Sequence, residues 1–300
     1  MSSLGAIPRP AVLAALATPY DAAGAPDAAL LARHGRRLLD AGLDGLVPFG
    51  TTGEGPMLTV AERKSVLEAL LGEGVPADRL LVGTGSAAPG DIAELAAHAT
   101  GLGVAGVLVM PPFFFTDVDA AGVEDSIAGV IRAVGDDRLR VVLYHIPQVA
   151  GVGVAPTVMH RLAAAFPGTI VGIKDSAGQR DATVRLCEGA GDLRVYVGAE
   201  PDVSAALGHG GAGAISGLAN LAPGLIRDLV DRPEDSGVQT RVGELVAAFD
   251  ALPLIPAIKA ALAECTGEPS WSRVRPPLRA LEPARLETVR RVLAAEETVG

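Results

Sequence analysis

Aromatic side chains and positive charge are both scarce in this 300-residue sequence. Phenylalanine, tryptophan and tyrosine together make up 3% of the chain, and 35 acidic residues outnumber 25 lysines and arginines, which leaves a formal net charge of −10 at pH 7. Proteins that bind nucleic acids need basic surfaces and commonly stack bases on aromatic rings. An acidic chain is also repelled by anionic membrane surfaces. We therefore expect neither nucleic acid nor membrane as a partner, and an anionic substrate would need a local positive site.

Cysteine, histidine and long apolar runs are scarce as well. Cys187 and Cys265 are the only cysteines, and neither they nor the five histidines follow the spacing of a metal-binding motif. No apolar run approaches the roughly 18 residues that cross a membrane. The short apolar run after Arg9 is followed by TPYD instead of a signal-peptide cleavage site. We therefore predict two reduced, buried thiols, no disulfide, no bound metal, no cofactor and a cytoplasmic location.

What the sequence does contain is a repeated alternation of short apolar runs with amphipathic stretches. Strands that alternate with helices form βαβ units and a parallel sheet. Eight such units within residues 1–230 match the (β/α)8 barrel, which needs roughly 250 residues. The eight expected strands lie in AVLAALATP, LDGLVPFG, RLLVGTG, AGVLVMPP, RVVLYHIP, TIVGIKDS, LRVYVGA and GAISGLAN.

Beyond Asn220 only helical patterns remain. We predict a barrel over residues 1–230 and a C-terminal helical extension over 231–300 that packs on it, because no low-complexity linker separates the two parts. Helix starts are also visible within the barrel. Thr59 followed three residues later by Glu62 is a capping box, and Asp91 with Glu94 repeats the pattern.

The strand TIVGI ends in a lysine, Lys174, at a position where a buried apolar run tolerates no unpaired charge. Active sites of (β/α)8 barrels lie at the carboxyl ends of the strands, so Lys174 is placed where chemistry occurs. A lysine amine that has lost its proton attacks a carbonyl to form a Schiff base, which then serves as an electron sink for making or breaking a C–C bond. The proton transfers of that reaction need a nearby hydroxyl. Tyr144 ends the preceding strand, one βα repeat earlier, and is the candidate.

The second strand is followed by GTTGEG, which supplies the hydroxyls of Thr51 and Thr52 and glycine-flanked backbone N–H groups. This combination can bind a small carboxylate. On its own it is equally compatible with a capped turn that binds nothing. His145 follows Tyr144 on the strand, so its side chain points to the opposite face and we expect it to be packed or hydrogen-bonded.

These segments resemble the dihydrodipicolinate synthase and N-acetylneuraminate lyase family, class I aldolases and synthases that use pyruvate on a (β/α)8 barrel. The resemblance covers nearly the whole chain and is carried by GTTGE, YHIP, GIKDSAG and GGAGAISGLAN. It implies that Lys174 forms the Schiff base, that Tyr144 is the catalytic phenol and that Thr51 is its hydroxyl partner.

The resemblance also implies the substrate contacts and the partners. Gly50 and Thr52 would bind the pyruvate carboxylate, and Ile215 would contribute a backbone group near the pyruvate. Glu200, soon after the seventh strand, stands where sugar-acid lyases of the family contact substrate hydroxyls, and the alternative is a solvated loop acid. Pyruvate and an aldehyde are the expected small-molecule partners, and the family implies a homo-oligomer, a dimer or a tetramer.

Two departures from the family pattern concern the aldehyde. Dihydrodipicolinate synthases usually carry an arginine after the YNIP-like motif, which binds the carboxylate of aspartate semialdehyde, whereas this chain has Val149. They also have a tyrosine after the fourth strand, where this chain has Phe113–Phe115. Arg180 is the nearest arginine that could substitute, and we expect it to face solvent.

We therefore predict a Schiff-base lyase or aldolase that makes or cleaves a C–C bond of a 2-oxo acid, with pyruvate as donor or product. The alternatives are 4-hydroxy-tetrahydrodipicolinate synthase itself, a 2-keto-3-deoxy sugar-acid aldolase or dehydratase, and a catalytically silent barrel that binds a small molecule. The identity of the aldehyde and the direction of the reaction stay open, because loop contacts set them.

Overall fold

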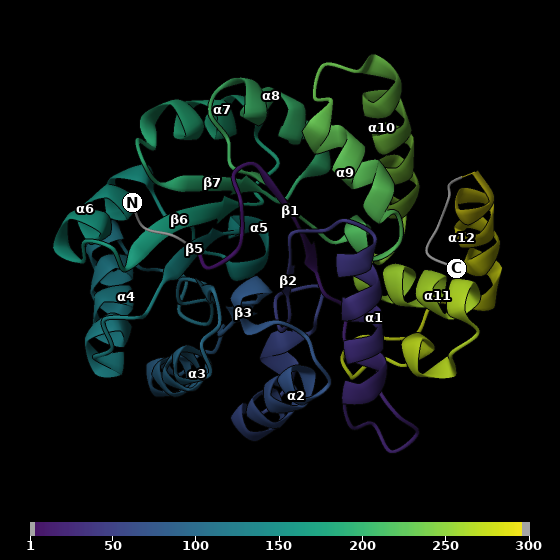
Figure 1. Ribbon diagram of the computed structural model, residues 1–300, viewed down its shortest axis with the longest axis horizontal. Helices are drawn as coiled ribbons and strands as arrows, with labels where there is room; N and C mark the ends of the chain where they lie inside the picture. The colour runs from purple at the N-terminus through teal and green to yellow at the C-terminus, as the bar shows by residue number, and fades with distance from the viewer. Residues whose placement is uncertain (1–3, 296–300) are drawn as a thin grey trace.

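Eight parallel strands form a nearly closed barrel in the computed structural model, which describes residues 4–295 (Figure 1). The hydrogen-bonded order is β2-β1-β8-β7-β6-β5-β4-β3, and one parallel bridge between Leu46 and Leu80 lies at the remaining seam. All eight predicted strands are present, so the predicted (β/α)8 class is confirmed. The strands are β1 Ala11–Ala15, β2 Gly45–Val47, β3 Leu81–Gly83, β4 Gly106–Val109, β5 Val141–His145, β6 Ile170–Asp175, β7 Arg194–Val197 and β8 Gly213–Ser216.

Helices cover the outside of the barrel. Those of the barrel are α1 Ala28–Asp40, α2 Val60–Gly72, α3 Pro89–Gly101, α4 Ala120–Val134, α5 Pro147–Ala150, α6 Pro156–Ala165, α7 Arg180–Gly189, α8 Val203–Gly208 and α9 Pro223–Asp231. Short 3-10 helices include η3 Glu200–Asp202, η4 Leu218–Asn220 and η5 Pro269–Ser272.

The two predicted helix starts have different outcomes. The capping box of Thr59 and Glu62 is present at the start of α2. The predicted cap at Asp91 is wrong, because α3 already begins at Pro89. Proline suits the first helical position, where no backbone N–H is needed. Asp91 lies in the first turn instead, where its carboxylate accepts a hydrogen bond from Ser86.

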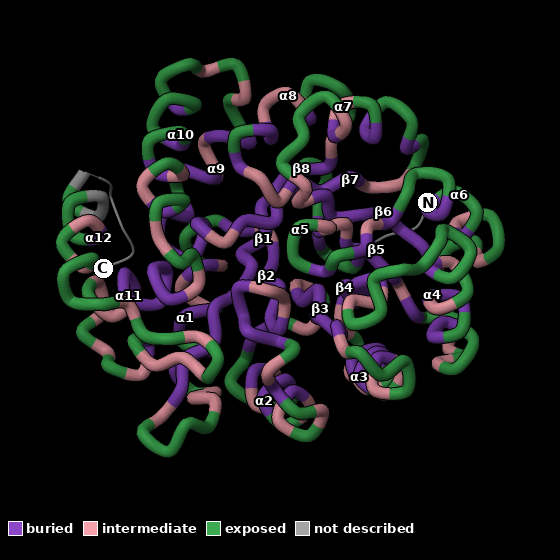
Figure 2. The backbone as a smooth tube through the Cα atoms, turned by 180° about the vertical axis from the view of Figure 1, so that it is seen from behind, coloured by how far each residue is buried: buried purple, intermediate pink, exposed green. Residues whose placement is uncertain are grey.

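Apolar side chains form two cores. The smaller core fills the barrel interior, and Leu4 and Ile7 belong to it together with Tyr144 and Ile215. The larger core lies between the strands and the surrounding helices. Figure 2 shows this arrangement, with the strands buried and the outer faces of the helices exposed. Because both faces of every strand are covered, the strands are apolar runs rather than alternating ones.

Three further helices follow α9 and pack beside α1 and α9 on one side of the barrel (Figure 1). They are α10 Ser236–Asp250, α11 Leu254–Thr266 and α12 Pro283–Ala295. The outermost residues of the two predicted ranges, 1–3 and 296–300, lie outside the described residues. Within residues 4–295 no single helix is long and apolar enough to cross a membrane, and α10 and α11 meet that criterion only together, across a bend of 110°.

The two cysteines are both helical, and neither is in a disulfide. Cys187 on α7 is buried, as predicted. Cys265 is only partly buried, and the prediction of a buried thiol is therefore wrong for this residue. It lies near the carboxyl end of α11, where the helix runs out toward the surface.

Candidate active site

The carboxyl ends of β5 and β6 bring Tyr144 and Lys174 together. The two residues are register partners on adjacent parallel strands, and Nζ of Lys174 lies 3.4 Å from the phenol oxygen of Tyr144. Oγ1 of Thr51, in the loop after β2, lies 3.2 Å from the same phenol oxygen. An amine, a phenol and an alcohol therefore form one continuous chain of hydrogen-bonding groups.

Lys174 is buried without a carboxylate partner. The residue is 5% exposed, and its Nζ lies 4.5 Å from the centroid of the Tyr144 ring. The other two lysines of the chain are paired with glutamates, Lys64 at 3.0 Å and Lys259 at 2.6 Å. No carboxylate among the described residues lies within 4.0 Å of the Lys174 amine. A buried amine beside a phenol, with no carboxylate partner among the described residues, is placed to act as a nucleophile.

The loop after β2 has little freedom to move. The hydroxyl of Thr18 donates a 2.7 Å hydrogen bond to the carbonyl of Gly53, and the N–H of Gly55 donates to the carbonyl of Gly50. A Cβ at Gly55 would overlap with the carbonyl of Phe49, so only glycine fits there. Glu54 has a left-handed φ of 54°, which is uncommon for a residue with a side chain.

The side chain of Glu54 explains why this backbone geometry persists. Its carboxylate is fully buried and lies 2.6 Å from Nζ of Lys259 on α11, and it also accepts a 3.3 Å hydrogen bond from the backbone N–H of Arg275. Burial lowers the pKa of Lys259 to about 8, and the charge of Glu54 opposes this shift. The C-terminal extension thus anchors the loop that carries Thr51.

The sequence does not single out Glu54 and Lys259 as a pair, although Lys259 stands at an unusual position. Lys259 interrupts the apolar run IPAIKAAL, as Lys174 interrupts TIVGIKDS. In a helix, however, one lysine among apolar residues commonly lies on the solvated face, so the position could not be recognised without its partner.

Lys174, Tyr144 and Thr51 line a cavity of about 220 Å³ at the carboxyl end of the barrel. Of the residues predicted to bind substrate, Thr52, Ile215 and Glu200 line the same cavity. Gly50 does not, and lines instead an adjoining cavity of about 20 Å³ that shares Thr51 and Tyr144. The outer wall comes from Val149 of α5 and from four residues of the C-terminal extension, Val246, Phe249, Asp250 and Leu254.

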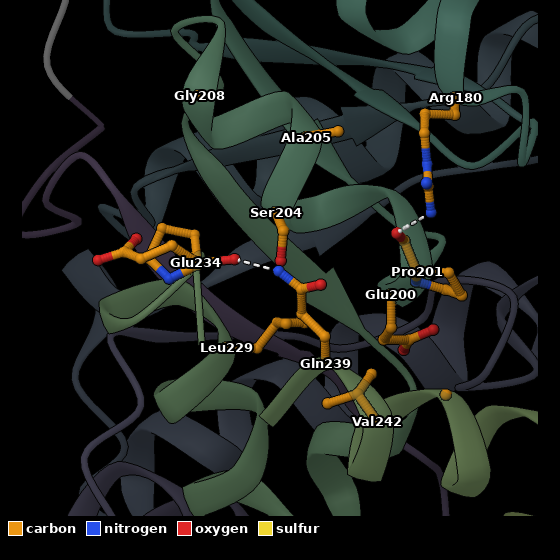
Figure 3. Close-up of a pocket in the computed structure, with 12 residues that line it drawn as sticks. Arg180, Glu200, Pro201, Ser204, Ala205, Gly208, Leu229, Glu234, Gln239 and Val242 are labelled. Atoms are coloured by element: carbon orange, nitrogen blue, oxygen red, sulfur yellow. Dashed lines mark hydrogen bonds between the residues drawn. The ribbon is translucent and has the colours of Figure 1, made fainter. Parts of the chain in front are cut away.

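Glu200 is not a solvated loop acid, because it is buried beside the cavity. The hydroxyl of Ser216 on β8 donates a 2.5 Å hydrogen bond to its carboxylate. Burial raises the pKa of Glu200, and the Ser216 hydrogen bond and the charge of Lys174 oppose this shift. Glu200 also lines a cleft of about 550 Å³ between α8, α9 and α10, shown with Arg180 and Gln239 in Figure 3.

The cavity contains little positive charge. Among the described residues that line it, Lys174 is the only lysine or arginine. Val149 is 58% exposed at the rim. Arg180 lies outside: its side chain is 59% exposed and binds Asp202. It also donates a hydrogen bond to the carbonyl of Pro201, which Figure 3 shows. The prediction that Arg180 faces solvent is confirmed.

The remaining residues discussed from the sequence do not line the cavity. The ring of His145 accepts a 3.0 Å hydrogen bond from the N–H of Val154, which is the hydrogen-bonded role expected of it. Phe113 packs against the barrel interior. Phe114 and Phe115 are exposed and contact each other edge to face, with ring centroids 5.2 Å apart.

A (β/α)8 barrel with a buried, unpaired lysine and a phenol at its carboxyl end is the arrangement of a class I lyase. Comparison with known proteins gives the family: residues 9–296 match the model of the dihydrodipicolinate synthetase family, and the chain belongs to it. It is a lyase of that family.

Individual relatives agree with this assignment. The chain is 35% identical over 256 residues to an uncharacterized DapA-like lyase of Chloroflexus aurantiacus, covering 84% of this chain and 85% of the relative. It is 34% identical over 296 residues to a 4-hydroxy-tetrahydrodipicolinate synthase of Synechococcus, covering 95% and 94%. The crystal structure of dihydrodipicolinate synthase from Agrobacterium tumefaciens is 33% identical and superposes with a TM-score of 0.91, covering 96% of this chain and all of that one.

Proposed function

We propose that the protein forms a Schiff base between Lys174 and the carbonyl carbon of a 2-oxo acid, pyruvate, and joins pyruvate to an aldehyde or releases it from a longer 2-oxo acid. The observation that carries this proposal is the chain from Lys174 through Tyr144 to Thr51 within one cavity. A structure of a family member from E. coli, 26% identical with a TM-score of 0.85, was determined in complex with pyruvate, which supports the choice of 2-oxo acid.

The proposed steps use the three groups in order. The Lys174 amine attacks the carbonyl of pyruvate, and loss of one water from the resulting carbinolamine gives an iminium. Tyr144, within reach of the amine nitrogen, carries protons to and from the departing oxygen, and Thr51 holds the phenol in line. Tyr144 then accepts a methyl proton to give an enamine, and the enamine carbon adds to the aldehyde while the aldehyde oxygen takes up that proton. Hydrolysis of the resulting iminium by one water releases the product and regenerates the Lys174 amine. The reverse order cleaves the same bond.

The contacts to pyruvate in this proposal come from the loop after β2 and from β8. The hydroxyl of Thr52 and the backbone N–H groups that start at Gly50 would bind the carboxylate. The backbone of Ile215 would lie against the pyruvate carbon chain, since Ile215 lines the cavity. Glu200, which lines the same cavity, would contact hydroxyl groups of the second substrate.

The experiment that tests the nucleophile is reduction with borohydride in the presence of pyruvate, followed by peptide mass mapping. We expect an adduct on Lys174 and none on Lys64 or Lys259, because those amines are held by glutamates. The Lys174→Arg variant should fold and form no adduct, since a guanidinium does not lose its proton. An adduct elsewhere, or none at all, would contradict the proposal.

We further propose that the aldehyde carries no carboxylate. No arginine lines the cavity within the described part of the chain, and Val149 stands at its rim. A charge-assisted hydrogen bond contributes about 1.5 to 3 kcal/mol, so its absence weakens use of aspartate semialdehyde by roughly ten- to more than a hundredfold. The alternative is 4-hydroxy-tetrahydrodipicolinate synthase, the activity by which relatives of about a third identity are named.

The two substrates can be separated by one substitution. We expect the parent to prefer neutral hydroxyaldehydes and Val149→Arg to raise kcat/KM for aspartate semialdehyde, both measured with pyruvate. Val149→Gln, which is similar in length but uncharged, is the matched control and should not raise it. If the parent already prefers the semialdehyde and the arginine adds nothing, the synthase is the better assignment.

Assembly and location are also part of the proposal. Phe114 and Phe115 are 76% and 74% exposed in the segment after β4, and a contact with a second copy would cover them. We expect a homo-oligomer by sedimentation, and a Phe114→Ser/Phe115→Ser variant should shift toward smaller species. A cytoplasmic location fits the two cysteines without a disulfide, and cell fractionation would test it.

A further inference from the structure

A second cavity, of about 330 Å³, lies between α1 of the barrel and the end of α11 with the adjoining η5. We call it the α1–α11 cavity. Its charged lining residues are Arg33 and Arg37 of α1 and Glu268, and Trp271 of η5 and Cys265 of α11 also line it. Two arginines and one glutamate give this cavity a positive excess on a chain whose formal net charge is −10.

Two N–H groups on residues that line this cavity are covered and have no acceptor among the described residues. The indole Nε1 of Trp271, a residue with no exposed surface, and Nε of Arg37 are both buried and make no hydrogen bond. A buried donor without a partner is costly, and native proteins keep such groups few. Both are N–H groups, so the partner they lack is an acceptor, and the arginines favour one with negative charge.

The rim of the cavity is closed only by an exposed ion pair. Arg33 and Glu268 meet at the rim with a nitrogen–oxygen distance of 3.4 Å, and their side chains are 54% and 47% exposed. A long, exposed ion pair of this kind is weak. An anion that replaces Glu268 beside Arg33 would occupy the cavity next to Arg37 and Trp271, and a shift of these side chains would let their covered N–H groups bind it.

The α1–α11 cavity is connected to the active site by side-chain hydrogen bonds. Nη2 of Arg37 lies 3.0 Å from Nδ1 of His34, whose Nε2 lies 3.1 Å from Oδ1 of Asn220. Because arginine only donates, Nδ1 of His34 accepts and its Nε2 carries the proton. Asn220 in turn donates a 2.8 Å hydrogen bond to the carbonyl of Gly217, which lines the catalytic cavity beside Thr52.

Asn220 also binds the end of β1. Its amide donates to the carbonyl of Ala15 at 2.8 Å, and its oxygen accepts from the N–H of Ala17 at 3.1 Å. The next residue, Thr18, holds the carbonyl of Gly53 in the loop that carries Thr51 and Thr52. The Asn220 side chain thus hydrogen-bonds both to the end of β1 and to Gly217 after β8, next to the place where a carboxylate would bind.

We propose that the α1–α11 cavity binds a small oxyanion, a carboxylate or a phosphate, and that its occupation changes the affinity of the active site for the 2-oxo acid. An anion bound to Arg37 competes with His34 for the guanidinium, which shifts the ring and the Asn220 contacts that depend on it. Anion binding in the α1–α11 cavity does not depend on the proposed catalytic function. The effect of the anion on affinity for the 2-oxo acid rests on that proposed function.

The sole tryptophan of the chain is Trp271, so its fluorescence reports binding in this cavity directly. We would titrate the full-length protein with inorganic phosphate and with succinate, at an ionic strength held constant with sodium chloride, and repeat the titration by calorimetry. Saturable binding of either probe is expected, and the better probe identifies the oxyanion. A linear response that chloride reproduces for both probes would overturn the proposal.

Three variants locate the site. Arg37→Met should weaken binding roughly ten- to a hundredfold, because it removes a charge-assisted donor. Arg33→Met changes an exposed side chain, so it keeps the fold and should also weaken binding. Arg36→Met is the matched control, since Arg36 lies on the same helix but pairs with Glu73 outside the cavity. Equal weakening in Arg36→Met would mean nonspecific attraction and would refute the site.

The coupling is tested by titrating the anion with and without saturating pyruvate. The anion affinity should change by a factor in the range of roughly 5 to 150, and the pyruvate affinity must change by the same factor in the presence of the anion. Asn220→Ala should abolish the change while anion binding persists. If pyruvate binds, as borohydride trapping reports, and the anion affinity does not respond, the coupling is refuted. If pyruvate fails to bind at all, the proposed catalytic function fails and the anion titrations still decide the site.

Discussion

Replacing Lys259 by methionine tests whether the C-terminal extension holds the loop after β2. Both side chains of the Lys259–Glu54 pair are fully buried at 2.6 Å, and Lys259 also lies 4.2 Å from the centroid of the Tyr20 ring. Methionine preserves the apolar stem but leaves the Glu54 carboxylate with one 3.3 Å hydrogen bond from Arg275. Removing one partner of a buried pair costs about 3 to 5 kcal/mol.

This loss is a large share of the 5 to 15 kcal/mol by which proteins are commonly stable. We expect it in the free energy of unfolding measured by urea denaturation. The double variant Lys259→Met/Glu54→Gln should recover most of it, because two neutral side chains leave no buried charge and glutamine keeps an acceptor for Arg275. Lys64→Met is the control: Lys64 forms an ion pair with Glu94 at the surface, and its loss should cost less than about 1 kcal/mol.

The same variants have a functional consequence. Glu54 follows Thr51 by three residues, and its left-handed backbone is held by the buried pair. The single variant should therefore also lower turnover, and the double variant should restore part of it. The reasoning is refuted if Lys259→Met costs no more stability than Lys64→Met, or if the double variant is no more stable than the single one.

Two further predictions concern a phenol and a buried imidazole. Tyr144→Phe should lower turnover by roughly 10² to 10⁴, the range for a positioned acid–base group. Tyr196→Phe is the control and should not lower turnover, because the hydroxyl of Tyr196 contacts Arg194 at 3.2 Å. Equal turnover in the two variants would remove Tyr144 from the mechanism. Burial lowers the pKa of His34 from 6.5 to about 3, so the unfolded chain binds a proton between these values that the folded protein does not, and stability falls as the pH drops below 6.5. From pH 7 to pH 5 the free energy of unfolding should fall by about 2 kcal/mol because of His34. In His34→Gln this loss should disappear from the pH profile of urea unfolding. In the control His160→Gln, which changes an exposed histidine, it should remain.

Local patterns in the sequence determined the fold class and much of the site. Each βα repeat encodes its own apolar strand and its own helix, so eight repeats specify a barrel, and the carboxyl ends of the strands specify where chemistry occurs. Lys174 and Tyr144 stand one repeat apart, and parallel register alone brings them side by side. That part of the site could be predicted because it follows from the geometry of adjacent strands.

Only the tertiary structure decided the contacts between distant segments. Lys259 and Glu54 are 205 positions apart, and no local pattern indicates that a helix of the extension supplies the countercharge for a barrel loop. The same holds for His34 and Asn220, which are 186 positions apart, and for Glu200, whose burial depends on Ser216 and on α10. The role of a buried charged or polar side chain can be recognised only together with its partner. Burial is tolerated when the partner is present and costly when it is absent.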